Sequence, residues 1–318
     1  MSFGLMNLSL SHYGKLEGDE ERFKVLDRAL ELGATLWDSA KYAVPLEGAS
    51  WKLVADKFGI KFDLANPMTF HHDSSAKYCR EACEKSLGRL GTDYIDLYYV
   101  HHVDPEVPIE QTMRALVELK SEGKIRYIGL SNITSATLRR AHKVHPISCV
   151  QQEYSPFTRD IETGSSTHLL HTCRELGVAV VCYSPLGRGL LTSTFVAGSF
   201  GSDPSDMRSK VFPRLCEDNR EVNVKLVGEL AKLAERKGCS TSQLALAWLM
   251  KQGHDIFPNP GTKRIKYLEE NWAALDISLS DEEEQEVRKF VESAEMAGGR
   301  LPEKYMNIPG DTKEEEEA

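Results

Sequence analysis

The chain has 318 residues, of which 41% are hydrophobic and 27% are charged, so its composition is that of an ordinary globular protein. Its length suits one α/β barrel of about 250 residues with additions. The net charge of −9, from 39 basic and 48 acidic residues, excludes the basic surplus that is typical of nucleic-acid-binding proteins.

The seven cysteines are scattered and form no C-x-x-C pair, which argues against a zinc site or a redox dithiol. We therefore expect no bound metal, and free thiols in a reducing compartment. The N-terminus lacks the pattern of a signal peptide, and no apolar run approaches the roughly 20 residues of a membrane span. These features predict a cytoplasmic protein that does not contact a membrane.

The N-terminal quarter alternates short apolar runs with amphipathic ones. A first run at 2–8 precedes a helix from Asp19 that stops at Gly33, and a short strand follows at 34–38. A weaker helix is predicted at 50–58 and a weaker strand at 61–65. This stretch, and above all 41–73, is the irregular part of the pattern.

The rest of the chain shows the alternation more clearly. A near-continuous apolar run at 94–101 is typical of a strand buried on both faces, and further strands are predicted at 125–130, 148–154, 178–183 and 255–258. Helices are predicted at 75–90, 109–122, 135–144, 168–176, 219–236, 242–251, 265–274 and 280–292. A long loop rich in Gly, Ser and Pro separates the strand at 178–183 from the next helix.

This order gives eight strand–helix units. Parallel neighbours need crossover connections, and eight units favour closure into a (β/α)8 TIM barrel over an open sheet. We predict one domain over residues 1–310, followed by an acidic, disordered tail at 311–318.

Functional groups of such a barrel lie at the C-terminal ends of its strands. The polar residues found there are Asp38, His101, Ser131, Asn132, Gln151, Glu153, Tyr183 and Ser184. Each also has a structural interpretation: His101 could be a hydrogen-bonded core group, Asp38 a paired carboxylate, and Tyr183 a core ring instead of a stacking platform.

The segment Pro260–Arg264 follows the last strand and combines a Gly-Thr pair with Lys263 and Arg264 just before a helix. Backbone donors, the helix dipole and two cations together predict an anion site. A basic surface loop would show the same sequence pattern. The G-x-G-x-x-G and G-x-x-x-x-G-K-[ST] fingerprints of dinucleotide-binding and P-loop proteins are absent.

At these residues the chain resembles the aldo-keto reductase superfamily, particularly its microbial NADPH-dependent reductases. The segments that carry the resemblance run in order from Tyr94 to Asn271. They are Tyr94-Ile-Asp-Leu-Tyr-Tyr-Val-His101, Gly123-Lys-Ile-Arg-Tyr-Ile-Gly-Leu-Ser-Asn132, Val150-Gln-Gln-Glu-Tyr-Ser-Pro-Phe157, Tyr183-Ser-Pro-Leu-Gly-Arg-Gly189 and Pro260-Gly-Thr-Lys-Arg-Ile-Lys-Tyr-Leu-Glu-Glu-Asn271.

The resemblance implies an NADPH site. Ser131, Asn132 and Gln151 would bind the nicotinamide carboxamide, Tyr183 would stack on the ring, and Asp38 would lie beside it. The pyrophosphate would be covered by Ser184, Pro185, Leu186, Gly187, Arg188, Gly189, Leu190 and Leu191. Gly261, Thr262, Lys263 and Arg264 would hold the adenosine 2′-phosphate, and Glu270 and Asn271 the adenine.

The resemblance also implies reduction of an aldehyde or ketone to an alcohol, with hydride from the cofactor and a proton from the protein. The family's acid is a tyrosine assisted by an aspartate, a lysine and a histidine; Asp38 and His101 match. Tyr42 follows Asp38 by four positions where the family has five, and Ala43 replaces its glycine. When Leu64-Ala-Asn-Pro-Met68 is aligned with the family's L-A-T-K-F, Pro67 takes the place of the lysine.

These departures leave alternatives. Tyr42 or His101 could be the proton donor of a working reductase on a small carbonyl substrate. Without the lysine, the chain could instead be a non-catalytic NADPH-binding homologue or a degenerate one. The chain also begins inside the family's first strand, so we expect the hairpin that plugs the barrel bottom to be missing.

Overall fold

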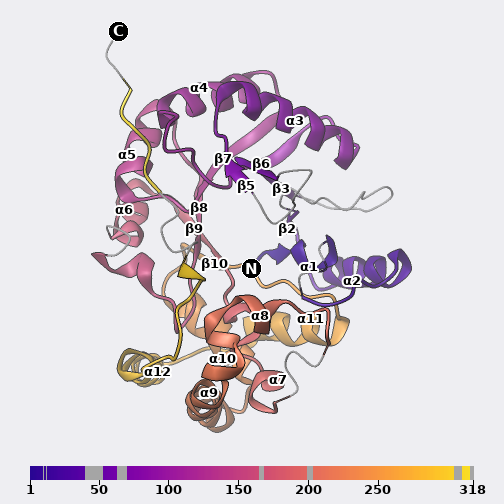
Figure 1. The fold of residues 1–318 in the computed structure, drawn as a ribbon, viewed down its shortest axis with the longest axis vertical. Helices are drawn as coiled ribbons and strands as arrows, with labels where there is room; N and C mark the ends of the chain where they lie inside the picture. Colours follow the sequence, from indigo (N-terminus) through magenta and orange to yellow (C-terminus); the bar gives the residue numbers. More distant parts are fainter. Residues whose placement is uncertain are drawn as a thin grey trace.

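The computed structural model describes residues 1–9, 11, 13–39, 53–62, 70–164, 168–198, 203–303 and 310–315. In Figure 1 the strands lie in the middle of the molecule and the helices stand around them. The strands of the main sheet, in spatial order, are β1 (Phe3–Gly4), β2 (Leu36–Asp38), β3 (Leu53–Phe58), β6 (Ile95–Val100), β7 (Ile125–Ser131), β8 (Cys149–Glu153), β9 (Ala179–Tyr183) and β10 (Ile256–Pro258).

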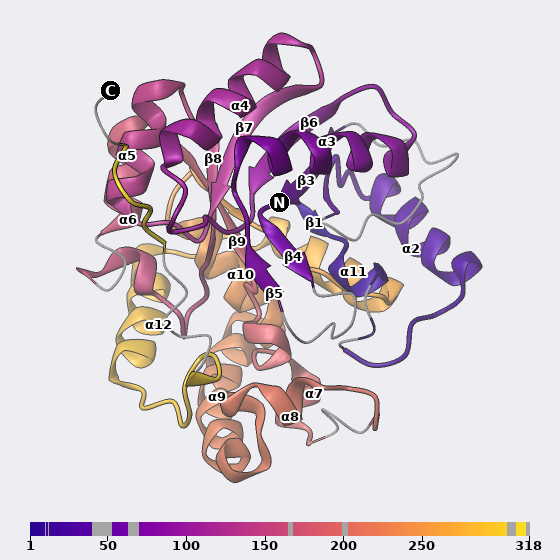
Figure 2. The same cartoon turned by 45° about the horizontal axis from the view of Figure 1, so that its top comes forward.

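All neighbouring strands of this sheet are parallel. Backbone hydrogen bonds from Ser2 N to Pro258 O (3.0 Å) and from Gly4 N to Pro260 O (3.1 Å) join the first strand to the last. The sheet is therefore closed, and the predicted TIM barrel is confirmed. A separate antiparallel hairpin, β4 (Ile60–Phe62) and β5 (Phe70–His72), follows β3 and is labelled in Figure 2.

The helices begin and end largely where the sequence places them. They are α1 (Met6–Ser9), α2 (Asp19–Glu31), α3 (Ala76–Leu90), α4 (Ile109–Ser121), α5 (Ser135–Val144), α6 (Leu169–Leu176), α7 (Ser193–Val196), α8 (Arg208–Val211), α9 (Glu217–Lys237), α10 (Thr241–Lys251), α11 (Ile265–Trp272) and α12 (Asp281–Ser293). Local chemistry explains the limits of α3: the Ser75 hydroxyl accepts the Tyr78 amide, and Gly91 adopts the left-handed conformation that ends the helix.

The region 50–62 differs from the prediction. Residues 53–58 form the buried barrel strand β3 and not a helix, and the strand predicted at 61–65 is represented by β4, outside the barrel. Asp56 and Lys57 are both buried in β3, so this strand lacks the near-continuous apolar run that marks β6. Because these two polar residues interrupt the apolar run, the sequence pattern resembles that of an amphipathic helix.

Alternate residues of each strand face the barrel interior, where they form rows across the sheet. One row pairs Lys57, Tyr99, Gly129 and Cys149, and another pairs Ser131, Gln151 and Val181. A β-carbon at Gly129 would lie 2.5 Å from the Tyr99 ring, so only glycine admits that ring to the interior. The polar members of these rows, Lys57, Ser131 and Gln151, lie towards the C-terminal ends of their strands, whereas the next row below Lys57 and Tyr99 is Ala55, Leu97 and Tyr127. The candidate site therefore lies at the C-terminal ends of the strands.

The opposite opening of the barrel is apolar. Leu53, Tyr127 and Phe257 stand in inward-facing register positions, yet they are 37%, 53% and 39% exposed. Among the described residues, no strand hairpin covers these side chains.

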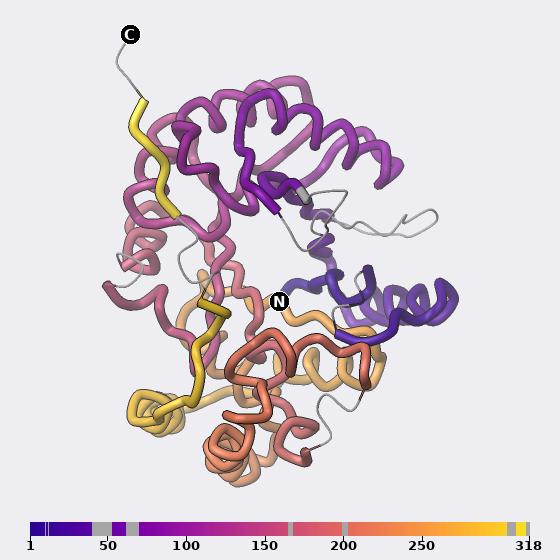
Figure 3. The backbone as a smooth tube through the Cα atoms, in the orientation of Figure 1, coloured from indigo at the N-terminus to yellow at the C-terminus, as the bar shows by residue number. Residues whose placement is uncertain are grey.

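The C-terminal segment also differs from the prediction. Residues 310–315, expected to begin a solvated tail at 311, lie against α4 and α5, as the yellow segment in Figure 3 shows. The Asp311 carboxylate accepts hydrogen bonds from Thr134 and Thr137 at the start of α5. Arg140 donates to the carbonyls of Thr312 (2.8 Å) and Lys313 (2.7 Å). Basic and hydroxyl groups distant in sequence thus hold the acidic segment in place.

Candidate functional site

A buried ion pair lies at the centre of the site. Asp38, the last residue of β2, accepts a hydrogen bond from the ammonium group of Lys57 on β3. Both side chains are almost fully buried. The second carboxylate oxygen of Asp38 accepts from Gln151 Nε2 and Asn259 Nδ2, each at 2.8 Å. Burial of a charge pair is costly unless its remaining lone pairs are satisfied, and these two amides satisfy them.

Lys57 corrects the sequence interpretation in which Pro67 takes the place of the lysine and the catalytic set is incomplete. Pro67 and Tyr42 lie outside the described residues, but a lysine does contact Asp38. The segment Val54-Ala-Asp-Lys-Phe58 follows the family's L-A-T-K-F with valine for leucine and aspartate for threonine. Alignment of the family motif with this segment would have identified Lys57 from the sequence.

Tyr99 lies next to this pair on β6. Lys57 Nζ is 5.2 Å from the centre of its ring, a cation–π distance, and its hydroxyl is 3.2 Å from Cys149 Sγ. Burial raises the pKa of Tyr99 well above its usual value near 10. Tyr99 therefore keeps its proton, and its uncharged ring packs against Lys57 inside the barrel.

His101 follows β6 directly and meets the end of β3. Its backbone amide donates to the carbonyl of Phe58 (2.6 Å), the residue after Lys57. Its carbonyl accepts from Asn132 Nδ2 (3.3 Å). The structure thus brings Asp38, His101 and Asn132, which the sequence places far apart, to one edge of the barrel.

Ser131, Asn132, Gln151 and Tyr183 form a second group beside the first. Ser131 and Gln151 are register neighbours on β7 and β8, and the Tyr183 hydroxyl donates to Asn132 Oδ1 (2.8 Å). Asn132 has a φ of +54°, a left-handed conformation that asparagine tolerates better than most residues. The group presents amide, hydroxyl and aromatic surfaces together, as binding of a carboxamide-bearing ring requires.

The loop after β9 is held by a buried carboxylate. Arg188, in the left-handed conformation at φ +59°, pairs with both oxygens of Glu153 at 2.7 and 2.9 Å. Arg300, beyond α12, pairs with the same carboxylate at 3.0 Å. Leu190 and Leu191 pack in the core. Sequence reasoning assigned no role to Glu153 and did not identify Arg300.

The segment after β10 meets the N-terminal region. Lys263 Nζ donates to the carbonyls of Tyr13 (3.1 Å) and Lys15 (2.7 Å), and burial lowers its pKa from its usual value. Thr262 Oγ1 accepts the amide of Arg264 (3.2 Å), the residue that precedes α11. The predicted anion site therefore keeps its two cations and the hydroxyl close to a helix N-terminus.

Glu270 and Asn271 lie on α11. Glu270 accepts a hydrogen bond from the Ser240 hydroxyl at 2.6 Å, and Asn271 is buried.

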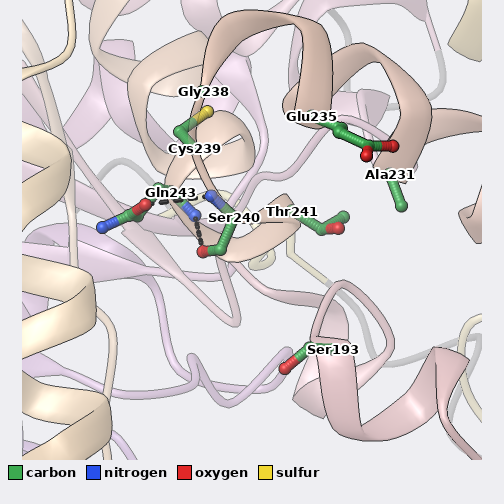
Figure 4. Close-up of a pocket in the computed structure, with 8 residues that line it drawn as sticks. All are labelled: Ser193, Ala231, Glu235, Gly238, Cys239, Ser240, Thr241 and Gln243. Atoms are coloured by element: carbon green, nitrogen blue, oxygen red, sulfur yellow. Dashed lines mark hydrogen bonds between the residues drawn. The ribbon is translucent and has the colours of Figure 1, made fainter.

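Ser240 lines a surface cavity of about 410 Å³ between α7 and the start of α10 (Figure 4). Its lining includes Ser193, Glu235 and Gln243. Sequence reasoning missed this cavity, which borders Glu270, because its residues cap a helix and carry no motif.

Within the described ranges, no three His, Cys, Asp or Glu side chains gather closely enough to hold a metal ion. Of the helices in the described part of the chain, none is both long and apolar enough to cross a membrane.

Comparison with known proteins identifies relatives over nearly the whole chain. The model of the Aldo/keto reductase family matches residues 1–292. The aldo-keto reductase str7 of Strobilurus tenacellus is 44% identical over 315 residues, which cover 94% of this chain and 90% of the relative. The aldo-keto reductase yakc [NADP(+)] of Schizosaccharomyces pombe is 41% identical, with 95% and 91% covered.

Solved structures agree. The glycerol dehydrogenase AKR11B4 of Gluconobacter oxydans superimposes with a TM-score of 0.78 at 27% identity, covering 91% of this chain and 90% of that one. The thermostable aldo-keto reductase Tm1743 gives a TM-score of 0.69 at 27% identity, covering 91% and 94%. With its closed barrel, its buried Asp38–Lys57 pair and these relatives, the chain belongs to the aldo/keto reductase family.

Proposed function

We propose that the protein reduces an aldehyde or ketone to the alcohol with NADPH, at the end of the barrel where Asp38, Lys57 and His101 meet. The observation that carries the proposal is the buried Lys57–Asp38 pair, because it supplies the group whose apparent loss argued for a non-catalytic protein. A name among the relatives that specifies NADP(+) supports the cofactor.

The side chains present fit this cofactor chemically. Asn132, Ser131 and Gln151 offer amides and a hydroxyl for a carboxamide, and Tyr183 offers a ring for stacking. Lys263, Arg264 and Thr262 offer charge and a hydroxyl before a helix N-terminus, which suits a phosphate. NADPH supplies hydride to the carbonyl carbon when it is bound.

The protein's part in the reaction is to place and protonate the carbonyl. We propose Tyr42 as the proton donor, with His101 as the other candidate. An ammonium group near a tyrosine favours the phenolate and lowers the tyrosine pKa from about 10 towards the working pH. Lys57 is the cation for this role, and Asp38 holds it in place through their buried contact. His101, at the end of β6, would orient the substrate oxygen.

Kinetics of NADPH oxidation with a panel of small aldehydes and ketones test the proposal. We expect many turnovers with NADPH and weaker use of NADH, since Lys263 and Arg264 would bind the 2′-phosphate. Tyr42→Phe should lower kcat by about 10²- to 10⁴-fold, the usual worth of a general acid, without weakening NADPH binding. Unchanged turnover would exclude Tyr42 and leave His101, and no turnover with any carbonyl would refute the proposal.

Membership of the family supports a small carbonyl compound as the partner, and the cytoplasmic location stays a prediction from the sequence.

A further inference from the structure

Three histidine rings form a column beside the site. His101 and His102 follow β6, and their ring centres are 5.2 Å apart with an angle of 27° between the planes. His72, the last residue of β5, stacks on the other side of His102 at 5.1 Å and 17°. The imidazole of His72, on the hairpin β4–β5, is thus separated from His101 by the single ring of His102. His101 is the histidine that orients the substrate carbonyl under the proposed function.

The middle ring is fixed by the cofactor side of the site. His102 Nε2 lies 3.5 Å from Asn132 Nδ2, whose amide oxygen is engaged by Tyr183. An amide N–H donates, so this contact favours the neutral His102 tautomer with its proton on Nδ1, while Asn132 Nδ2 also donates to Ser131 Oγ at 3.0 Å and to the His101 carbonyl at 3.3 Å. Gly59 lies against the backbone of His102, because a β-carbon there would be 2.4 Å from the His102 carbonyl oxygen.

Among the described residues, two nitrogens of the column are buried and have no hydrogen-bond partner. These are His102 Nδ1 and His72 Nε2. A buried polar atom that makes no hydrogen bond is costly, and native structures leave few of them. Both rings are neutral near pH 7, because burial lowers the pKa of His102 to about 3 and that of His72 below its usual value. Uncharged imidazoles suit an uncharged hydrogen-bonding group better than a carboxylate or phosphate.

We propose that His72 and His102 bind a second oxygen of the substrate, a hydroxyl or oxo group a few bonds from the carbonyl that is reduced. This inference rests on the proposed function and deepens it: the substrate class is neutral hydroxy- or dicarbonyl compounds. The ring spacing of about 5 Å along the column matches the separation between two oxygens of one small molecule. Protonated Nδ1 of His102 donates to that oxygen, and His72 is its second contact.

Matched four-carbon substrates test the inference. Butanal has no second oxygen, 3-hydroxybutanal has a neutral one, and 4-oxobutanoate has an anionic one. We expect kcat/KM for 3-hydroxybutanal to exceed that for butanal by about 10- to 100-fold, the discrimination achieved when a buried site donor would be left unpaired. The anionic substrate should show no such gain. A uniform binding contact should appear mainly in KM.

The variants His102→Phe and His72→Phe keep an aromatic ring for stacking and remove the nitrogens. Each should reduce the ratio of kcat/KM for 3-hydroxybutanal to kcat/KM for butanal towards one. His102→Asn should restore part of that ratio because its amide donates. The control is His71→Phe, since His71 is exposed on the same strand. NADPH binding, measured by fluorescence, should be unchanged in His72→Phe and His71→Phe, which shows that the site is folded in these variants.

The outcomes are distinguishable. Equal kcat/KM for butanal and 3-hydroxybutanal in the wild type, or a preference that survives both phenylalanine substitutions, overturns the role of the histidines while leaving carbonyl reduction intact. Absence of turnover with all three aldehydes, and with the wider carbonyl panel, overturns the proposed function and this inference with it.

Discussion

Replacing Lys57 by methionine is the most informative perturbation, because it removes the ammonium group and keeps much of the aliphatic stem. Asp38 would stay buried with two amide donors but no cation. Breaking a buried ion pair by removing one partner lowers the free energy of unfolding by about 3–5 kcal/mol. Because two hydrogen bonds to Asp38 remain, we expect Lys57→Met to lie at the low end of this range, at about 3 kcal/mol. Asp38→Asn combined with Lys57→Met removes both charges and should recover part of that loss.

Urea unfolding of the two variants, with kcat measured under the same conditions, gives both readouts. If Tyr42 is the acid, its pKa rises without Lys57 and kcat falls by about 10²- to 10⁴-fold at neutral pH. Because a general acid must carry its proton, reduction should not recover at high pH; partial recovery there is expected only for the reverse oxidation of the alcohol, in which the phenolate accepts the proton. The double variant should regain stability but not activity.

The matched control is Lys61→Met. Lys61 also pairs with a carboxylate, Asp73, but the pair is only half-buried, so its loss should cost no more than about 1 kcal/mol. A Lys57→Met variant that is as stable and as active as Lys61→Met would refute the reasoning that the buried pair organises the site.

Three further predictions concern the cofactor loop, the barrel interior and acid stability. Glu153→Gln leaves Arg188 and Arg300 without their shared charge, so NADPH should dissociate faster in stopped-flow fluorescence; an unchanged rate would show that the pair does not hold the loop. Gly129→Ala forces the Tyr99 ring to move and should destabilise by about 1–3 kcal/mol, whereas an unaffected urea midpoint would contradict the close approach. Arg140 lowers the pKa of Glu110 below its usual 4.5, so this pair contributes stability above pH 4.5 that is lost as pH falls through the lowered pKa; the stability difference between wild type and Glu110→Gln should shrink between pH 7 and pH 3, and a constant difference would count against the pair.

The barrel could be predicted because its signals are local. Strands such as Ile95–Val100 are apolar throughout, and Gly91 and Gly177 mark helix ends where the structure has them. The polar residues at strand ends, among them Asp38, Asn132 and Gln151, could be selected by their position alone, because a parallel barrel gathers those ends at one face. The structure confirms that these residues meet.

The features that sequence reasoning missed depend on partners distant along the chain. Lys57 is acceptable in a buried strand only because Asp38, nineteen residues earlier, neutralises it. Asn259 becomes part of the site through the same carboxylate, 221 residues away. Thr312 and Asp311 are ordered by groups on α4 and α5. Neither composition nor periodicity contains these pairings.

The most direct test of catalysis is transfer of a label. The wild-type protein should be incubated with NADPH that carries deuterium at the transferred position of nicotinamide C4, together with an aldehyde that it consumes. The account predicts one deuterium on the carbinol carbon of each alcohol formed, and one alcohol for each NADPH oxidised over many turnovers. Tight NADPH binding with no labelled alcohol would contradict the claim that the site around Asp38 and Lys57 is a working reductase.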